Sequence, residues 1–388
     1  MLKRLFLLIA GVAWVADASA QTPLRIGLIT TLSGGGAILG EELKRGWDLG
    51  MDLVQNRIGG VETQVTVADD QLKPDVAVTA VDRMINQDKV DIVAGILWSN
   101  IMLAVADPVL KSGTVLLSTN AGPSQLAGKD CNALYISTSW QNDEYAEGTA
   151  VLMNADGMKN AYFVAPNYPA GKDVKAAFDH TFKGSDVGGT FFKLGQTDFQ
   201  AELTEIRSRN PQSVVAFAPG AMGIAFMKQY QALGLGQSSR LYTINMVDYT
   251  TLPAIGEAAL GTFHVSVYDP TASNPANQRF VAEFARKYKR LPTQYAMQAY
   301  DGVMLLDATV KSMKGRFGDH KALVAAMRKT KLESPRGPFS YNINNFPIQN
   351  MYKIEAVVGA DGKPVLRGAG IAVPMEKDSH YGACPLKW

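Results

Sequence analysis

The stretch "LRIGLITTLSGGGAILGEELKRGWDLGMDLVQNRIGG", residues 24–60, decides the fold class of this chain. It opens with the short apolar run 24–30, passes through a glycine-rich turn, and continues as a longer segment in which Leu43 and Trp47 recur on one face of a helix. The closing Gly-Gly pair is suited to end that helix. A buried strand followed by an amphipathic helix is the repeating unit of a parallel sheet.

The same alternation continues along the chain. Further short apolar runs stand at residues 63–70, 91–97, 114–119, 161–166, 188–194, 213–219 and 241–245. Amphipathic segments separate these runs, which indicates parallel sheets covered by helices on both faces. Because the strands are too many for one small sheet, we predict an α/β fold with two doubly wound parallel-sheet lobes.

The lobes are expected to be discontinuous in sequence. The pattern restarts after residue 140, where Asn142 and Asp143 are placed to cap a helix. It changes again near residue 268, where a strand leaves into a polar, proline-containing loop, and a strand-like segment follows the helices expected at 275–290 and 295–314. We therefore predict a hinge with three crossings and a cleft between the lobes. The predicted N-terminal lobe comprises residues 21–140 plus 269–340, and the C-terminal lobe comprises residues 141–268 plus 341–388.

The first twenty residues have the form of a signal peptide. Lys3 and Arg4 precede the apolar run "LFLLIAGVAWVA", and Ala18-Ser19-Ala20 has the small-x-small pattern of a cleavage site. The apolar run is about twelve residues long, whereas a spanning helix needs roughly 20. We predict export to the periplasm with removal of residues 1–20.

Composition and motifs exclude several function classes. The 38 Lys and Arg nearly balance the 36 Asp and Glu without a basic block, so neither nucleic acid nor a membrane surface is an expected partner. The four histidines lack metal-ligand spacing, and neither a GxSxG elbow nor a nucleotide-binding glycine motif occurs. The acidic pairs Glu41-Glu42 and Asp69-Asp70 are interpreted as structural, at a helix start and a strand end. No catalytic set, metal or cofactor is predicted.

The chain contains two cysteines. Cys131 and Cys384 are 253 positions apart in a chain bound for an oxidising compartment, where such a pair is more often bridged than free. A disulfide would pin the C-terminal tail to the first third of the chain, and two free thiols are the alternative.

Several segments carry a family resemblance. Together with the opening stretch, they are "VADDQLKPDVAVTAVDRMINQDKVDIVAGILWSN", "LLSTNAGPS", "YFVAPNYPAGKDVKAAF" and "MKQYQALGL". In this order they resemble the type I periplasmic solute-binding proteins of ABC importers, the leucine/isoleucine/valine-binding family. The resemblance covers essentially the whole mature chain. It implies a monomer whose two lobes close on one small ligand, and an ABC permease in the inner membrane as partner.

The resemblance also implies which loops hold a ligand carboxylate. They follow two neighbouring strands, and their residues are Ser99, Ser118, Thr119, Asn120 and Ala121. Strand ends of parallel sheets face a crevice, where small residues let a ligand approach the backbone. The alternative is an ordinary strand-to-helix turn with Pro123 near the first helical position. From the second lobe, Tyr168 matches the family's aromatic residue that packs on the ligand, and Trp98 and Trp140 are further candidate walls.

Two departures from the family pattern bear on the ligand. Asn245 stands where amino-acid binders place an acid for the ligand's ammonium group, and a buried ammonium without that partner is costly. Small residues around Gly220 replace a family aromatic, which we expect to lengthen the pocket. We therefore predict an aromatic acid similar to benzoate, hydroxybenzoate or cinnamate, as the "NAGPS … SWQND" combination also suggests by its resemblance to the aromatic-acid branch. If Asp248 were the ammonium partner, the ligand would instead be a branched-chain or other hydrophobic amino acid. A receptor that reports ligand to a membrane sensor is a further alternative.

Overall fold

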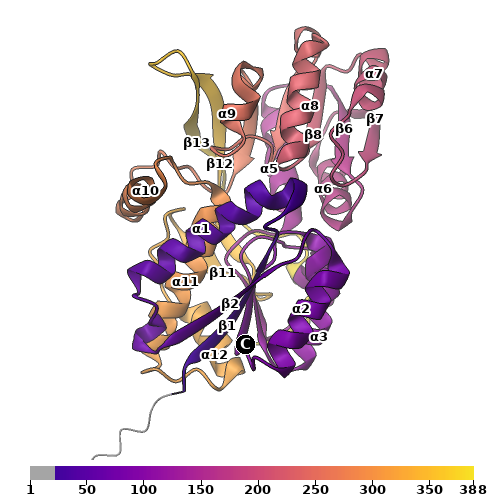
Figure 1. The fold of residues 1–388 in the computed structure, drawn as a ribbon. Helices are drawn as coiled ribbons and strands as arrows, with labels where there is room; N and C mark the ends of the chain where they lie inside the picture. The colour runs from indigo at the N-terminus through magenta and orange to yellow at the C-terminus, as the bar shows by residue number, and fades with distance from the viewer. Residues whose placement is uncertain (1–21) are drawn as a thin grey trace, which may run out of the picture.

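The computed structural model describes residues 22–388, so the predicted signal peptide lies outside the described residues. The chain forms two α/β lobes, one above the other in Figure 1, with a parallel sheet at the centre of each. This confirms the predicted fold class. Among the described residues, no helix combines the length and apolar character needed to cross a membrane.

The N-terminal lobe is built on a five-stranded parallel sheet. Its strand order is β2-β1-β3-β4-β5, with β1 (Leu24–Thr30), β2 (Thr63–Asp69), β3 (Ile92–Gly95), β4 (Val115–Ser118) and β5 (Tyr135–Ser137). The helices of this lobe are α1 (Ala37–Leu53), α2 (Pro74–Asn86), α3 (Ser99–Lys111), α4 (Ser124–Ala127), α11 (Gln294–Ser312) and α12 (His320–Lys329). Although α1 and α11 are far apart in sequence, they pack along one another (Figure 1).

The C-terminal lobe contains an eight-stranded sheet. Its parallel part follows the order β10-β9-β8-β6-β7, and β12 adds to β10 in the antiparallel direction. The strands are β6 (Asn160–Pro166), β7 (Ser185–Phe192), β8 (Ser213–Phe217), β9 (Arg240–Ile244), β10 (Phe263–Ser266), β11 (Phe339–Tyr341), β12 (Pro347–Val358) and β13 (Pro364–Glu376). The helices between β5 and α11 are α5 (Asn142–Ala155), α6 (Pro169–Thr181), α7 (Gln200–Arg209), α8 (Ala221–Ala232), α9 (Leu252–Ile255) and α10 (Pro275–Tyr288).

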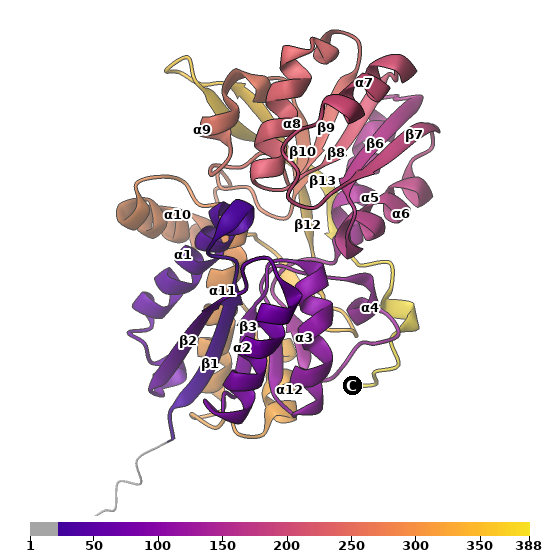
Figure 2. The same ribbon diagram turned by 45° about the vertical axis from the view of Figure 1, so that its right-hand side comes forward.

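The C-terminal tail departs from the predicted lobe boundaries. After β13 the chain returns to the N-terminal lobe near α4, where Cys384 and Cys131 form a disulfide (Figure 2). Asp378 accepts hydrogen bonds from Asn342 and Asn344, and Asn344 also donates to the backbone of the N-terminal lobe at Ala127. The tail is therefore tied to the N-terminal lobe as well as to the turn before β12 and, through His380 and Asp143, to α5. The return from β13 adds a fourth crossing to the predicted three.

A buried ion pair holds the crossing segments together. Arg336 and Asp301 are both fully buried and lie 3.0 Å apart. Arg336 also donates to the carbonyls of Thr138 and Ser139 and to the side chain of Gln349. The guanidinium is thus bonded to α11 and to two segments that pass between the lobes, and removing it would leave the buried carboxylate of Asp301 without its charged partner.

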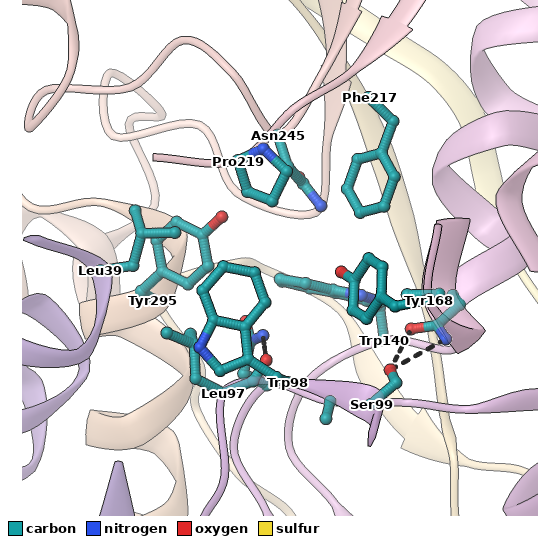
Figure 3. A pocket seen from close by; sticks show the side chains of 14 residues that line it. Leu39, Leu97, Trp98, Ser99, Trp140, Tyr168, Phe217, Pro219, Asn245 and Tyr295 are labelled. Carbon is teal, nitrogen blue, oxygen red and sulfur yellow. Dashed lines mark hydrogen bonds between the residues drawn. The ribbon is translucent and has the colours of Figure 1, made fainter. Parts of the chain in front are cut away.

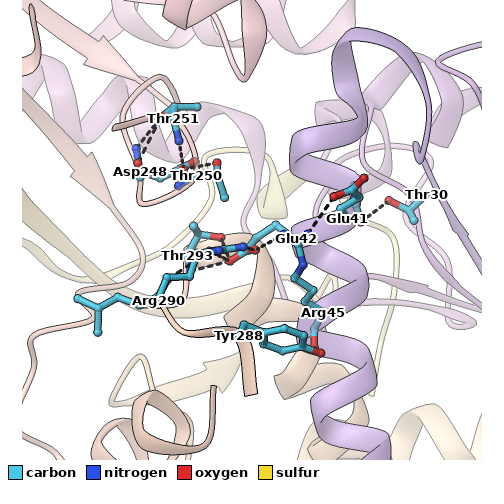
Figure 4. Close-up of polar contacts among 12 residues, drawn as sticks. Thr30, Glu41, Glu42, Arg45, Asp248, Thr250, Thr251, Tyr288, Arg290 and Thr293 are labelled. Carbon is cyan, nitrogen blue, oxygen red and sulfur yellow. Dashed lines mark hydrogen bonds and ion pairs between the residues drawn. The ribbon is translucent and has the colours of Figure 1, made fainter. Parts of the chain in front are cut away.

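Two local predictions need correction. Helix α5 begins as expected near residue 142, but its N-cap is Gln141, whose side chain accepts from the backbone N–H of Asp143 at 3.0 Å. Glu42 does not complement the start of its helix, because α1 already begins at Ala37. Its carboxylate is fully buried and bound by Arg290 and Thr293, which attaches α1 to the start of α11 (Figure 4).

Candidate binding site

A cavity lies between the two lobes, at the carboxyl ends of their parallel strands. About 340 Å³ of empty space, including solvent at its open side, lies between the side chains that line it. Figure 3 shows these side chains converging from both lobes. The lining residues are Leu39, Leu97, Trp98, Ser99, Asn120, Ala121, Trp140, Asn142, Tyr168, Ala170, Phe217, Pro219, Asn245 and Tyr295.

Polar side chains line the cavity from both lobes, Ser99 and Asn120 from the N-terminal lobe and Asn142 and Asn245 from the C-terminal lobe. Ser99 is the first residue of α3, whose first backbone N–H groups have no partner within the helix. The amide of Asn142 donates to Ser99 Oγ at 3.1 Å and fixes the hydroxyl at the cavity wall. Asn120 donates to the carbonyl of Leu97 at 2.6 Å, while its own Oδ1 is buried without a partner. This wall can therefore donate to an anion through the helix start and Ser99.

Ser118 and Thr119 lie behind the cavity rather than at its wall. Ser118 Oγ donates to the carbonyl of Ala121 at 2.6 Å, which holds the loop after β4 in a tight turn. Thr119 is fully buried and its methyl group faces Gly302 of α11. Gly122 completes the turn, because a Cβ there would lie 2.0 Å from the carbonyl oxygen of Trp140. These residues shape the loop that presents Asn120 and Ala121.

Five aromatic rings form the apolar part of the cavity. Tyr168 and Phe217 of the C-terminal lobe lie nearly parallel, with ring centroids 6.2 Å apart. Trp98 meets Tyr168 across the cleft at 6.1 Å, and Trp140 meets Tyr295 edge-on at 6.2 Å. Such rings offer flat apolar faces to a ligand.

Hydrogen bonds on the side away from the cavity fix the orientation of Trp98. Its indole N–H donates to Thr31 Oγ1 at 2.9 Å, and Thr31 donates to Asp70 at 2.5 Å. Burial raises the pKa of Asp70, and the bond from Thr31 offsets part of that rise. The acidic pair at the end of β2 therefore supports the cavity wall without entering it.

Asn245 lines the cavity, whereas Asp248 does not. Asn245 follows β9 with a left-handed φ of 53°, and its Oδ1 accepts a hydrogen bond from Gln294 at 2.9 Å. The amide nitrogen then points into the cavity (Figure 3). The carboxylate of Asp248 instead accepts bonds from Thr250 and Thr251 of its own turn, and it does not line the cavity (Figure 4).

Gly220 is not part of the cavity wall. Phe217 and Pro219 occupy that side instead, together with Leu39 of α1. The expectation that small residues lengthen the pocket here is wrong, because Leu39 closes the space: a Cβ on Gly220 would lie 3.3 Å from the Leu39 side chain.

The sequence analysis did not identify half of the residues that line the cavity. The missed residues are Leu39, Leu97, Asn142, Ala170, Phe217, Pro219 and Tyr295. Phe217 and Pro219 stand at the end of β8, so the strand-end rule could have found them. Leu39 and Tyr295 come from helices, and no local signal in the sequence distinguishes them from other apolar helix residues.

The cavity carries no formal charge. None of its lining residues is Asp, Glu, Lys, Arg or His. Within residues 22–388, no group of three or more His, Cys, Asp or Glu side chains is arranged to hold a metal ion. The wall offers hydrogen bonds and aromatic faces, which suits reversible binding.

Comparison with known proteins gives concordant matches. A family model described as periplasmic binding protein matches residues 23–363. The Leu/Ile/Val-binding protein homolog 6 of Brucella melitensis is 30% identical over 362 residues, covering 89% of this chain and 91% of that protein.

Two solved structures are similar over both lobes. An ABC-transporter solute-binding protein from R. palustris, in complex with benzoate, is 31% identical with a TM-score of 0.88, covering 94% of this chain and 100% of that one. A solute-binding protein of an ABC transporter from Rhodopseudomonas palustris BisB5, in complex with 3,4-dihydroxybenzoic acid, is 26% identical with a TM-score of 0.86, covering 92% and 99%.

These matches agree with the two lobes, the interlobe cavity and the family resemblance found in the sequence. Members of the family bind small molecules, work with membrane permeases and are not enzymes. The chain belongs to the periplasmic binding protein family and is a substrate-binding protein of an ABC transporter.

Proposed function

We propose that this protein captures an aromatic carboxylate, similar to benzoate, hydroxybenzoate or cinnamate, in the periplasm and delivers it to an ABC permease. The observation that carries the proposal is an uncharged cavity walled by five aromatic rings, with hydrogen-bond donors at one side. Closure needs only that the ligand's contacts favour the closed lobes over the open ones.

The start of α3 is the proposed place for the ligand carboxylate. The helix has 13 residues, and its N-terminal N–H groups carry a partial positive charge. Ser99 adds a hydroxyl beside them, held by Asn142. These groups can hold an anion without a basic side chain, as helix N-termini do for phosphates and carboxylates.

Asn245 is the main argument against an α-amino acid. Its Oδ1 is bonded to Gln294, so the group directed at the cavity is an amide N–H, which cannot accept from an ammonium. Asp248 is the nearest acid in the sequence, and its carboxylate is bonded to Thr250 and Thr251. A buried ammonium would therefore lack an anionic partner, at a cost of several kcal/mol.

Two solved relatives support the aromatic-acid proposal. Both were crystallised with benzoic acids, and both match this chain over more than nine-tenths of its length. A hydrophobic amino acid remains the second candidate, because the matching Brucella protein is named as a Leu/Ile/Val-binding homolog. The unpartnered Oδ1 of Asn120 also favours it, since that atom could accept from an ammonium.

A ligand screen decides between the two candidates. The mature protein is titrated with benzoate, 4-hydroxybenzoate and cinnamate, and separately with branched and aromatic α-amino acids, by thermal shift and then calorimetry. A ligand at 100 times its Kd adds about 2.7 kcal/mol to the free energy of unfolding, which moves the midpoint visibly. We expect the aromatic acids to raise the midpoint, and a shift with amino acids alone would refute the proposal.

The transport and signalling roles use the same residues. Permease and ATPase genes beside the gene for this chain would support delivery of the aromatic acid to an importer. A neighbouring sensor kinase instead would support a receptor that reports the ligand.

A further inference from the structure

A buried hydrogen-bond chain leads from the hinge to the cavity wall. Gln294, at the start of α11, is only 8% exposed. Its Oε1 accepts from Tyr145 Oη and from Ser266 Oγ, each at 2.9 Å, and its Nε2 donates to Asn245 Oδ1 at 2.9 Å. Gln294 belongs to the N-terminal lobe and its three partners to the C-terminal lobe, so this one side chain bridges the lobes directly behind the cavity.

The direction of this chain is set by backbone groups. Ser266 Oγ accepts from the N–H of Tyr268 at 3.1 Å, and Tyr145 Oη accepts from the N–H of Val267 at 3.5 Å. A hydroxyl that accepts from a backbone N–H still has its single proton to place, and both hydroxyls donate that proton to the glutamine oxygen. The glutamine oxygen is thereby occupied, and its NH₂ group faces the asparagine. The asparagine must then accept with its oxygen and turn its own NH₂ group toward the cavity.

We propose that Gln294 is a specificity-determining residue that acts through Asn245. It does not line the cavity, but it holds the Asn245 amide with the donor facing the ligand. The wall at this point therefore selects a ligand that presents an acceptor oxygen and disfavours an ammonium or an aryl amine. This inference rests on the proposed function and deepens it, because it locates the discrimination against amino acids in the hinge.

The variant Gln294→Glu should reverse the direction of the hydrogen bond between residue 294 and Asn245. A carboxylate at this position still accepts from Tyr145 and Ser266, and it also accepts from Asn245, so the asparagine must turn its oxygen toward the cavity. With its carboxylate at the start of α3, 4-methoxybenzoate carries at its far end an ether oxygen, which accepts but cannot donate, and this oxygen would then face an acceptor. We expect the Kd of 4-methoxybenzoate, measured by calorimetry, to rise at least about tenfold, as for a buried polar group that loses its partner.

A double-mutant cycle separates the effect of turning the Asn245 amide from the effect of the added charge. In an Asn245→Ala background, Gln294→Glu should change the 4-methoxybenzoate Kd by less than about twofold, because the group that it reorients is absent. Benzoate is the matched control ligand. It lacks the ether oxygen, so Gln294→Glu should change its Kd much less than the Kd of 4-methoxybenzoate.

The outcomes distinguish the inference from the proposed function. An equal loss in the Asn245→Ala background overturns the inference, since charge alone would then explain the effect. Equal losses of affinity for benzoate and 4-methoxybenzoate in Gln294→Glu also overturn it, because the ether oxygen would then not be the group that Asn245 recognises, and leave the function intact. Binding of no aromatic acid overturns both. If thermal unfolding shows that Gln294→Glu does not fold, Gln294→Met takes its place, with a loss of a few-fold expected only when Asn245 is present.

Discussion

The two lobes contribute different chemistry to one cavity. The N-terminal wall carries the start of α3, Ser99 and Asn120, all placed at the ends of β3 and β4. The C-terminal wall carries Tyr168 and Phe217, whose rings are nearly parallel, and the amides of Asn142 and Asn245. Both walls stand at the carboxyl ends of parallel strands, so topology alone does not make them different.

The difference indicates that the two lobes bind different parts of the ligand. A carboxylate can be held by the N-terminal wall alone, because helix N–H groups and a hydroxyl supply its hydrogen bonds. The aromatic faces and the amide of the C-terminal wall complete the site when the lobes come together. We expect the first wall to provide anion binding and the second to provide shape and the choice between ligand classes.

The largest expected effect comes from a charge on the C-terminal wall. Asn245→Asp places a carboxylate in an uncharged cavity that is proposed to hold an anion. Like charges brought together in a buried site cost several kcal/mol, so the Kd for aromatic acids should rise on the order of 1,000-fold. Calorimetry measures the change. Asp248→Asn is the control: it alters charge three residues away, outside the cavity, and an affinity loss of similar size there would mean that the two walls are misassigned.

Loss of the disulfide should affect stability rather than binding. The bridge between Cys131 and Cys384 ties the tail to the N-terminal lobe, and neither cysteine lines the cavity. Replacing both with serine should lower the free energy of unfolding by about 3 kcal/mol, as for a bridge that closes a long loop, and leave the Kd within about twofold. Denaturant unfolding and calorimetry measure the two quantities. Two free thiols in the exported protein, seen by mass spectrometry, would contradict the bridge.

Matched truncations compare the two walls directly. Tyr168→Ala removes a ring from the C-terminal wall and should weaken binding of an aromatic acid about 30-fold, the equivalent of about 2 kcal/mol of apolar contact. Ser99→Ala removes a hydroxyl but keeps the helix start, so a loss of about fivefold is expected. Tyr168→Phe, which keeps the ring, is the control. Unchanged affinity in both alanine variants, with folding intact by circular dichroism, would remove these residues from the site.

The smallest expected effect is a pH dependence near the end of β13. Burial raises the pKa of Glu376 from its ordinary value of 4.5 to about 7, and the charge of Glu147 adds to the rise. Between these two values the folded state holds the proton more tightly than the unfolded state, so the free energy of unfolding falls as pH rises.

Glu376→Gln should remove this slope. The side chain is partly exposed, so the change between pH 5 and pH 8 is expected to be only about 1 kcal/mol. His380 acts in the same direction, because Asp143 raises its pKa, and it contributes equally to both proteins. Thermal unfolding across this range measures the slopes, and parallel curves for the two proteins would contradict the assignment to Glu376.

Much of the fold could be predicted because its signals are local. Each run of apolar residues that forms a parallel strand is short and bounded, and the segments between have helical periodicity. The cysteine pair correctly suggested that the tail is tied to Cys131, but the lobe boundaries left the tail with the C-terminal lobe. Its bonds to Asn342 and Asn344 join residues that are distant in sequence. Glu42 was misread for the same reason: its partner Arg290 lies 248 positions away.

The sequence by itself determined the family, the two-lobe plan and the strand-end loops, because strand–helix alternation and the residues after each strand are local patterns. It also has Asn245, rather than an acid, at a position that lines the cavity. Only the tertiary structure decided that Leu39 and Tyr295 close the cavity, and that Gln294 sets the direction of the Asn245 amide. Those facts depend on how α1 and α11 pack beside the second lobe, and contacts between elements far apart in the chain leave no periodic signal in the sequence.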